Sequence, residues 1–576
     1  MNFCTTGIKE YWANDNLLLA GKWCEINNEE FLINKNYEIL EYPWNDRDSL
    51  YMAYLKTNKK YVKVLKALKL FLNDYNKTNY SIKYWEILIG IWLKFFLHTL
   101  YDRYTIINQA ASKYIDLQTF VGLDQLIVPA DFDEWFNLSI CNQYYNFILF
   151  SQIVRNIETT ISLKKITIAN CSFDINTNEI NNRDHHNLTL LLKKLFPVLS
   201  KKNKVFIFKS NYPIIHEIKN SIKSKTFPCY YMDDIKYPRI TKLDQETRMG
   251  LLSIEKSDSF DSLISKIILR FIPKSYLEHH KIIEKHISKS FRTNPKIIVS
   301  GNSFIGNDRF KALAAYNYEN GSKLVVHQHG GQYGASKFYP LEEHEKSIAD
   351  KYITWGWKDN KKNVTAGNTL ILPPKKFQNK QSNKFLIGSV SSPPFTKYFY
   401  SAALSQQIMI EFEMLISMIS QIKPEIRNYI YYRLKNDYGW SENKKISARF
   451  PEINIEKPSD ISFTKSLLNS KIFLSTYNAT IFLESFINNI PTLLFWKKEY
   501  HELRDSAIKN YIMLEKVGIL HYDYSSAANH INNIYKNPYH WWNKKEVQSA
   551  KNNFCDYYAN QTDYSTIDYR KYFNEN

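Results

Sequence analysis

The stretch Lys323–Trp357, KLVVHQHGGQYGASKFYPLEEHEKSIADKYITWGW, places a glycine-rich turn between two short apolar segments. The run Leu324–Val326 predicts a buried strand, because short apolar runs bounded by turn residues are typical of buried strands. The turn that follows, His327–Gly334, has three glycines in five positions, which lets the backbone approach a ligand closely or adopt positive φ. Ligands of open α/β sheets bind beyond the carboxyl ends of strands, so we interpret this turn as the edge of an active site. The alternative is a structural turn with one or two hydrogen-bonded core histidines.

The residues around this turn predict a parallel sheet. Ile297–Ser300 predicts a strand, residues 308–318 a helix, and Leu324 begins the next strand. The order strand, helix, strand is that of a βαβ unit, whose two strands run parallel. An acidic cluster, Glu342–Glu345, follows the turn, and Tyr352–Trp355 predicts a further strand.

Composition and charge exclude several classes of protein. A chain of 576 residues allows about two to four domains, and its 44% of hydrophobic residues argues against disorder. The formal charge of +19 comes from lysines spread along the chain, with no compact basic block, so we expect no nucleic-acid partner. The six cysteines form no C-x-x-C pair, which favours neither a zinc site nor a disulfide framework and is typical of a reducing cytoplasm.

Two segments bear on targeting. The N-terminal residues 1–12 lack a basic region followed by an apolar core, so no signal peptide is predicted. The most apolar segment, Ile87–Leu100, is shorter than the roughly 20 residues that span a membrane, and it carries Lys94 and His98. We therefore predict a buried helix there and a cytoplasmic protein.

The pattern divides the chain into two α/β domains. The N-terminal domain covers residues 1–357 and contains a helical region at about 47–162; a polar linker follows at 358–383. A C-terminal Rossmann-like domain covers 384–545, and 546–576 form a helical tail.

Two local features of the N-terminal domain also carry predictions. A weak strand is predicted at Cys229–Met232. We interpret Asp102 and Arg103 as a local pair on a solvated helix face, with a buried pair near the substrate as the alternative.

The C-terminal domain contains the more specific motif. A strand leads into S-T-Y-N-A-T (475–480), a helix follows with Glu484 one turn in, and Ile490-Pro491 leads to the next strand. The free N–H groups at the start of a helix favour a phosphate. Arg433 and Lys435 end the neighbouring strand on one face and would neutralise a diphosphate or phosphodiester leaving group.

These two motifs together resemble GT-B glycosyltransferases. The pairing of H-G-G (329–331) with S-T-x-N-A-T…E…I-P is closest to bacterial CDP-glycerol glycerophosphotransferases and capsule-polysaccharide transferases. A second resemblance covers nearly the full length and is to a family of transferases encoded in bacterial surface-polysaccharide loci. It rests on TTGIKEYW (5–12), YPWNDR (42–47), LYDRY (100–104), QHGGQYG (328–334) and DKYITWGW (350–357).

The resemblance implies an α/β, GT-B-like fold of two Rossmann-like domains facing a cleft, with the acceptor on the N-terminal side. His329 would be the general base, because neutral imidazole takes a hydroxyl proton near pH 7; Glu345 and His327 are further candidates. The implied donor-binding residues are Gly330, Gly331, Tyr333, Gly334, Ser391, Arg433, Lys435, Thr476, Tyr477, Asn478, Ala479, Thr480 and Glu484.

The chain departs from the glycerophosphotransferase pattern at the donor motif. Tyr477 and Asn478 stand where Asp and Ser are usual, and Arg433-Leu434-Lys435 replaces Arg/Lys-x-His-Pro. The donor therefore stays open among CMP-, CDP-, UDP- and GDP-linked compounds. We saw no Asp-x-Asp motif of the kind that binds a divalent ion with a nucleotide sugar, so we expect metal independence and no bound cofactor.

The sequence thus predicts a transferase that moves a sugar from a nucleotide-activated donor onto a lipid-linked precursor of a surface polysaccharide or lipopolysaccharide, with peripheral contact to the inner membrane. One alternative is transfer of glycerol or ribitol phosphate from a CDP donor. A metal-dependent hydrolase would use His327, His329, His344 and Asp350. A binding protein without catalysis is the remaining alternative.

Overall fold

The structure is a computed structural model that describes residues 1–12, 16–123, 126–166, 205–209, 242–290, 295–369, 382–561, 569 and 573. The strand predicted at Cys229–Met232 lies outside the described residues. So do residues 370–381 of the predicted linker and most of the predicted tail beyond residue 561.

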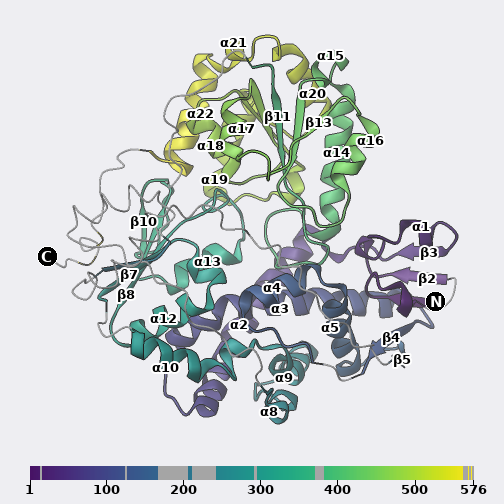
Figure 1. The fold of residues 1–576 in the computed structure, drawn as a ribbon, viewed down its shortest axis with the longest axis vertical. Helices are drawn as coiled ribbons and strands as arrows, with labels where there is room; N and C mark the ends of the chain where they lie inside the picture. The colour runs from purple at the N-terminus through teal and green to yellow at the C-terminus, as the bar shows by residue number, and fades with distance from the viewer. Residues whose placement is uncertain are drawn as a thin grey trace.

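Three all-parallel sheets form the framework (Figure 1). The first has the order β3-β2-β1-β4-β5 and comprises β1 (Asn2–Cys4), β2 (Asn16–Leu19), β3 (Asn36–Ile39), β4 (Gln118–Gly122) and β5 (Ser162–Ile166). The second has the order β10-β9-β8-β7-β6 and comprises β6 (Val205–Ile207), β7 (Ile297–Ser300), β8 (Lys323–His327), β9 (Lys351–Thr354) and β10 (Val364–Ala366). The third has the order β13-β12-β11-β14-β15-β16 and comprises β11 (Phe385–Ser389), β12 (Ile430–Leu434), β13 (Asn454–Ile455), β14 (Ile472–Ser475), β15 (Thr492–Phe495) and β16 (Leu520–His521).

This architecture confirms the predicted α/β class with Rossmann-like domains. In chain order the third sheet reads 3-2-1-4-5-6, the order of doubly wound dinucleotide-binding folds, so its strand order reverses between β11 and β14. The sequence did not reveal that the N-terminal half holds two separate sheets. Its strands β4 and β5, QTFVG and SLKKI, are short and partly polar, and the second is mostly exposed.

Along the chain, two long helices lie between β3 and β4 of the first sheet. The side chain of Asp46 accepts hydrogen bonds at the start of α2 (Arg47–Asn76), and Lys77 ends α2 in the left-handed conformation with φ 54°. Ser81 caps α3 (Ile82–Lys113), whose apolar part Ile87–Leu100 is buried. Within the described ranges, no helix combines the length and the apolar character that crossing a membrane requires.

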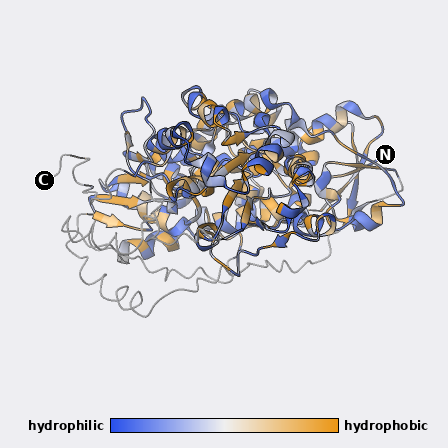
Figure 2. Ribbon diagram, turned by 90° about the horizontal axis from the view of Figure 1, so that it is seen from above, coloured by the Kyte–Doolittle hydropathy of each residue, from blue (hydrophilic) through white to orange (hydrophobic). Residues whose placement is uncertain are grey.

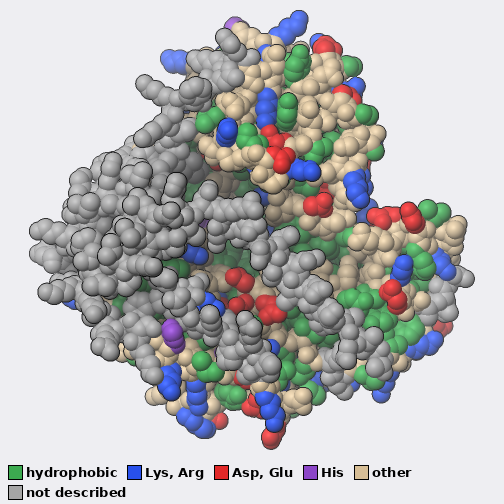
Figure 3. Space-filling model, in the orientation of Figure 1, with side chains coloured by type: hydrophobic (Ala, Val, Ile, Leu, Met, Phe, Trp, Pro, Cys, Tyr) green, Lys and Arg blue, Asp and Glu red, His purple; other side chains and the backbone are tan. Residues whose placement is uncertain are grey.

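The other helices pack around the sheets. Beside the first two sheets lie α1 (Glu29–Leu32), α4 (Phe132–Cys141), α5 (Gln143–Asn156), α8 (Gln245–Met249), α9 (Ser259–Phe271), α10 (His280–Ser290), α11 (Ser303–Gly306), α12 (Asp308–Glu319) and α13 (Pro340–Ile348). Around the third sheet lie α14 (Ile408–Gln421), α15 (Pro424–Arg427), α16 (Glu442–Arg449), α17 (Phe463–Leu468), α18 (Thr480–Ile487), α19 (Asp505–Lys516), α20 (Tyr524–Ile534), α21 (Pro538–Trp542) and α22 (Lys545–Tyr558). Figure 2 shows strands coloured as hydrophobic among helices of mixed character. Basic and acidic side chains are interspersed over the face seen in Figure 3.

A segment that we call the interdomain strap, residues 390–404, joins the third sheet to α3. The guanidinium of Arg103 donates to the Thr396 carbonyl at 2.8 Å, to the Ser139 carbonyl at 3.2 Å and to Asn146 Oδ1 at 3.0 Å. It also pairs with Asp102 at 2.8 Å, and the two side chains are 0% and 3% exposed. The prediction of a solvated pair is therefore wrong, because the strap, α4 and α5 cover this face of α3.

A second arginine ties the start of α2 to the C-terminal half. Arg47 Nε donates to Glu502 Oε1 at 2.7 Å, and Nη1 donates to Gln407 Oε1 at 3.1 Å. Nη2 reaches the carbonyls of Tyr400 and Ala402 in the strap at 3.4 and 3.3 Å. The strap is thus held by buried or nearly buried charges at two points.

We predict that Arg103→Met lowers the free energy of unfolding by about 3–5 kcal/mol, because Asp102 would be left as an uncompensated buried charge. The midpoint of urea denaturation checks this. The control is Lys77→Met, which removes an exposed pair with Asp74 and should have little effect. Equal midpoints for the two variants would contradict the structural role of Arg103.

Candidate active site

The turn after β8 is held by the side chain of Gln328, which is fully buried. Its amide nitrogen donates to the Gly330 carbonyl at 2.7 Å. Its amide oxygen accepts from the backbone of Trp355 at 2.9 Å and from the indole of Trp357 at 2.7 Å. The turn is therefore fixed to the end of the neighbouring strand β9. Gln328 was not among the predicted site residues. The only signal in the sequence was its position between His327 and His329 in H-Q-H-G-G.

His329 and Glu345 come together at this turn. His329 Nδ1 lies 3.1 Å from Glu345 Oε1; the histidine side chain is 18% exposed and the carboxylate 0%. Tyr352 donates to the other oxygen of Glu345 at 3.3 Å, and the Tyr333 hydroxyl lies 3.3 Å from His329 Nε2. Burial raises the pKa of Glu345, and the nearby His329 opposes that effect. The two side chains form a close contact rather than a hydrogen bond, because neither Nδ1 nor Oε1 has a hydrogen-bond partner among the described residues. The carboxylate is close enough to orient the imidazole.

His327 lies apart from this pair. Its ring is 1% exposed, and Nε2 lies 3.2 Å from the Tyr569 hydroxyl. Burial lowers the pKa of His327 to about 3, so its imidazole is neutral at physiological pH. The structure favours a structural histidine at this position over a catalytic one.

The residues of the hydrolase alternative are scattered. His344 is buried against Gly90 of α3, and Asp350 accepts from the backbone of Leu324. In the part of the chain that the structure describes, no group of three or more His, Cys, Asp or Glu side chains is arranged to hold a metal ion.

An Asp-x-Asp tripeptide does occur at Asp131-Phe132-Asp133, which the sequence analysis overlooked. Asp131 caps α4 by accepting from the backbone of Glu134. Burial, with the charges of Asp131 and Asp308, raises the pKa of Asp133 to about 7.

The glycines of the turn serve close packing. Gly331 N donates to Thr480 Oγ1 at 3.0 Å, and a Cβ at Gly331 would lie 2.8 Å from backbone atoms of Ala479 and Thr480. The turn therefore docks on the N-terminus of α18. Gly334 has a φ of 76° and lies against Trp357, where a Cβ would meet ring atoms at 2.4–2.5 Å.

A pocket of about 270 Å³ opens beside this contact, at the carboxyl ends of β11 and β12 in the third sheet. It is lined by Gly388, Ser389, Arg433, Lys435, Pro458, Phe463, Tyr477 and Ile481. It adjoins the point where the strand order reverses, which is where open α/β sheets bind ligands.

Three of the predicted donor residues line this pocket. Tyr477 and Arg433 form part of its wall; Arg433 also pairs with Glu456 at 2.8 Å. Lys435 is exposed at the pocket, and it has no ion pair among the described residues. Partial burial and the charge of Lys397 lower the pKa of Lys435.

Other predicted donor residues bond within the protein. Asn478 is buried and accepts from the Tyr511 hydroxyl at 2.8 Å, and Ser391 donates to the buried Glu442. Thr476 donates to Ser389 Oγ at 3.1 Å. Glu484 is half-buried and accepts from Thr464, and burial raises its pKa. Gly330, Tyr333, Gly334, Ala479 and Thr480 belong to the docking contact and its support.

The structure adds Lys397, which the sequence analysis did not single out. Its ammonium lies 5.0 Å from the ring centre of Tyr398 and 5.1 Å from that of Tyr400, and it forms no ion pair among the described residues. The only signal in the sequence was a lysine in the aromatic run T-K-Y-F-Y (396–400). Besides partial burial, the charge of Lys397 is close enough to lower the pKa of Lys435, and neither lysine has a carboxylate partner in the described chain. We call these two lysines the cation pair.

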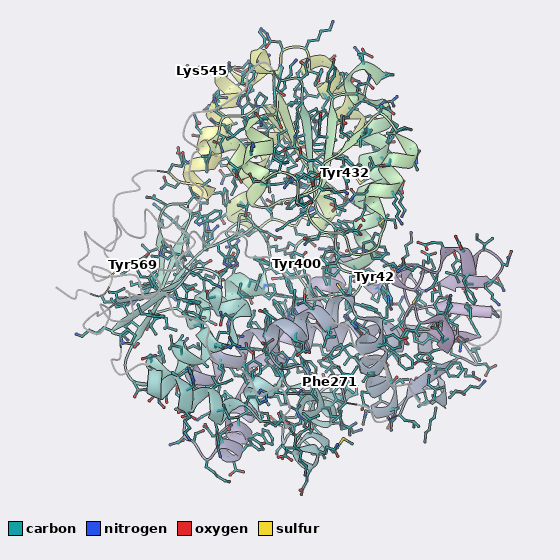
Figure 4. All side chains as sticks on the ribbon, viewed as in Figure 1. Tyr42, Phe271, Tyr400, Tyr432, Lys545 and Tyr569 are labelled. Atoms are coloured by element: carbon teal, nitrogen blue, oxygen red, sulfur yellow. The ribbon has the colours of Figure 1, made fainter. Side chains whose placement is uncertain are left out.

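An aromatic row connects the cation pair to His329. The rings of His329 and Tyr333 are 5.3 Å apart, those of Tyr333 and Tyr339 5.0 Å, and those of Tyr339 and Tyr400 6.0 Å. Figure 4 shows Tyr400 between the third sheet and the helices beneath it. The row lines the junction between the two halves of the protein.

The fold and this site define a multidomain α/β protein with a histidine–carboxylate pair docked on a Rossmann-ordered sheet. The chain belongs to the LIC12162 family of transferases, whose family model matches residues 1–573. No curated protein matches the chain.

Several solved structures align weakly with the chain. A point mutant of the Thermobaculum terrenum O-GlcNAc transferase aligns with a TM-score of 0.34 and 9% identity over 83% of this chain and 87% of the other. Acinetobacter baumannii MurG has a TM-score of 0.30 and 10% identity over 61% and 95%. The spinosyn rhamnosyltransferase SpnG, complexed with spinosyn aglycone, has a TM-score of 0.31 and 6% identity over 61% and 95%.

We predict that Gly331→Ala destabilises the protein by about 1–3 kcal/mol, because the added methyl group would overlap the backbone at the start of α18. Thermal melting and amide hydrogen exchange over 328–334 check this. The matched control is Gly330→Ala, whose Cβ would meet only the Tyr333 ring, at 3.1 Å. A Gly331 variant as stable and as protected from exchange as this control would argue against the docking contact.

Proposed function

We propose that the protein is a GT-B-type glycosyltransferase that moves a sugar from a nucleotide-activated donor onto a precursor of a cell-surface polysaccharide or lipopolysaccharide. The observation that carries this proposal is the contact between Gly331 and Thr480. It brings the His329–Glu345 pair of the second sheet to the strand reversal of the third sheet. Membership in a transferase family supports the class of reaction.

The pocket at the third sheet is the proposed donor site. Phe463, Tyr477 and Ile481 offer apolar surface for a nucleobase, and Glu484 lies one turn along α18 from Ile481 for a ribose hydroxyl. Lys435 and Lys397 would neutralise the phosphate groups. Cations that lack a protein carboxylate are available to a ligand, whereas Arg433 already pairs with Glu456.

In the proposed reaction His329 is the general base. With Nδ1 facing the Glu345 carboxylate, Nε2 is the nitrogen that accepts a proton, and the acceptor hydroxyl would take the place of the Tyr333 hydroxyl, which lies 3.3 Å from Nε2. The acceptor hydroxyl gives its proton to Nε2 while its oxygen forms a bond to the anomeric carbon of the donor sugar. The bond from that carbon to the phosphate oxygen breaks, and the nucleotide leaves with the electron pair and its added negative charge. Lys397 and Lys435 would stabilise this charge.

We place the acceptor, a lipid-linked glycan, on the side of the junction formed by the aromatic row. Tyr339 and Tyr400 are partly exposed there, and rigid aromatic surfaces are common in ligand sites. Nucleotide-activated sugars and lipid-linked precursors meet at the cytoplasmic side of the inner membrane, so we expect the enzyme to work there. We also expect it to need neither a metal ion nor a bound cofactor.

We predict that one nucleotide among CMP, CDP, UDP and GDP, or its sugar conjugate, selectively raises the melting temperature, with or without EDTA. A ligand at 100 times its Kd stabilises the folded state by about 2.7 kcal/mol. Lys435→Met and Lys397→Met should remove most of the shift, whereas Lys444→Met, an exposed lysine of the same domain, should not.

The same melting-temperature measurements can contradict the proposed donor site in three ways. No shift with any nucleotide would reject the donor site. Destabilisation by EDTA would revive a metal-dependent enzyme. A shift that survives in both lysine variants would place the phosphates elsewhere.

We predict that His329→Ala lowers turnover by about 10²–10⁴-fold while nucleotide affinity is kept, because proton transfer is lost and the donor pocket is intact. Glu345→Gln should also lower turnover with nucleotide affinity kept, because the buried carboxylate that faces Nδ1 would no longer orient the imidazole. His540→Ala, an exposed histidine on α21, is the control. Full turnover in His329→Ala would reject the base.

A further inference from the structure

The outer face of α2 carries an unusual stripe of exposed side chains. Four large apolar residues of this helix are exposed, with Met52 at 63%, Leu55 at 36%, Val62 at 52% and Leu70 at 68%. Two exposed lysines stand between them in the sequence. The full stripe is Met52, Leu55, Lys59, Val62, Lys66 and Leu70.

The stripe is narrow and continuous. At 3.6 residues per turn its six positions fall within about 80° of the helix circumference, and at 1.5 Å per residue they extend over about 27 Å. The opposite side of α2 is buried, with Leu65, Leu68 and Leu72 at 4%, 0% and 0% exposure. The helix therefore uses one apolar side for the core and presents a second one outward.

The lysines of α2 fall into two groups, one paired with carboxylates of the protein and one exposed on the stripe. Lys63, beside the stripe, and Lys60, nearer the buried side, reach Asp261 at 3.0 and 2.8 Å, and Lys56 reaches Asp258 at 3.4 Å. Lys59 and Lys66, like Lys69 at the other edge, form no ion pair within the described ranges. No acidic residue occurs in α2 between Asp48 and Asp74.

We propose that this stripe binds the surface of an anionic phospholipid bilayer, with α2 lying along the membrane plane. Exposed apolar side chains on such a helix enter the boundary between headgroups and acyl chains. Lysines beside them extend their ammonium groups to anionic headgroups while their alkyl stems stay on apolar surface. The unpaired lysines of the stripe supply the complementary charge for that surface.

Charge also weighs against two other partners. A second copy of the chain would place lysines against lysines or apolar residues in either orientation, because the stripe has no acidic residue. A nucleic acid would gain phosphate contacts from the lysines but would leave Met52, Val62 and Leu70 in water.

Docking through α2 would also orient the candidate active site. The helix begins at Arg47, which binds Glu502, Gln407 and the strap. The junction between the two halves is therefore held at a fixed height above a bilayer on which α2 lies. The stripe stands on its own observations and does not depend on the proposed sugar transfer.

The test is sedimentation of the full-length protein with vesicles of phosphatidylcholine alone or of phosphatidylcholine with phosphatidylglycerol. We expect binding only to the anionic vesicles, and weaker binding at high salt. Two double variants address the stripe: Lys59→Glu with Lys66→Glu, and Val62→Ser with Leu70→Ser. Each should lower the partition coefficient by about tenfold or more.

The matched controls are on α19, which exposes Ile508 and Ile512 at 41% each. We expect vesicle binding to be unchanged in two double variants of α19, Lys509→Glu with Lys516→Glu and Ile508→Ser with Ile512→Ser. This helix also exposes the acidic residues Asp505 and Glu515, whose charges oppose contact with an anionic surface. Circular dichroism and thermal melting verify that all variants fold.

Three outcomes would overturn the proposal. The first is no binding to anionic vesicles, and the second is an equal loss in the α19 controls. The third is a change of oligomeric state in the stripe variants by gel filtration, which would assign the stripe to an interface between copies.

Discussion

The docking of Gly331 on the start of α18 is the constraint on which the candidate site depends. The separation between the turn and the helix leaves no room for a Cβ, so the position requires glycine. The turn is fixed on its own side by Gln328, whose amide uses both its oxygen and its nitrogen. His329 is therefore held between two rigid elements, one from each half of the protein. A base held in this way needs little reorganisation before it accepts a proton.

The cationic side chains near the junction separate into two groups. Arg103 and Arg47 are paired with carboxylates and donate to backbone carbonyls, so their charge is neutralised by the protein itself. Lys397 and Lys435 have aromatic or solvent surroundings and no carboxylate partner in the described chain. Neither lysine is committed to a protein carboxylate, so each can pair with a negatively charged ligand. That contrast distinguishes charges that stabilise the fold from charges available to a ligand.

Much of the fold could be predicted from sequence, because parallel buried strands are continuous apolar runs such as Leu324–Val326 and Ile472–Leu474. The first sheet was missed where its strands are short and polar. The contact between His329 and Glu345 could have been predicted from the sequence, because both residues were already candidates for the catalytic site. The contact between Gly331 and Thr480 joins residues 149 positions apart, and no spacing rule in a single sequence reports such a pair. The roles of Lys397 and Arg103 depend on the strap, whose path is set by tertiary packing.

The salt bridge between Arg47 and Glu502 has a consequence for how the chain is made. Its partners are separated by 455 residues, so the second emerges from the ribosome roughly 20–90 s after the first at ordinary elongation rates. During that interval the first sheet, α2 and α3 can pack, but the strap has no anchor in the C-terminal half. The junction can therefore assemble only after Glu502 has been synthesised, and chains truncated before the third sheet would contain the His329–Glu345 pair without the surface on which its turn docks.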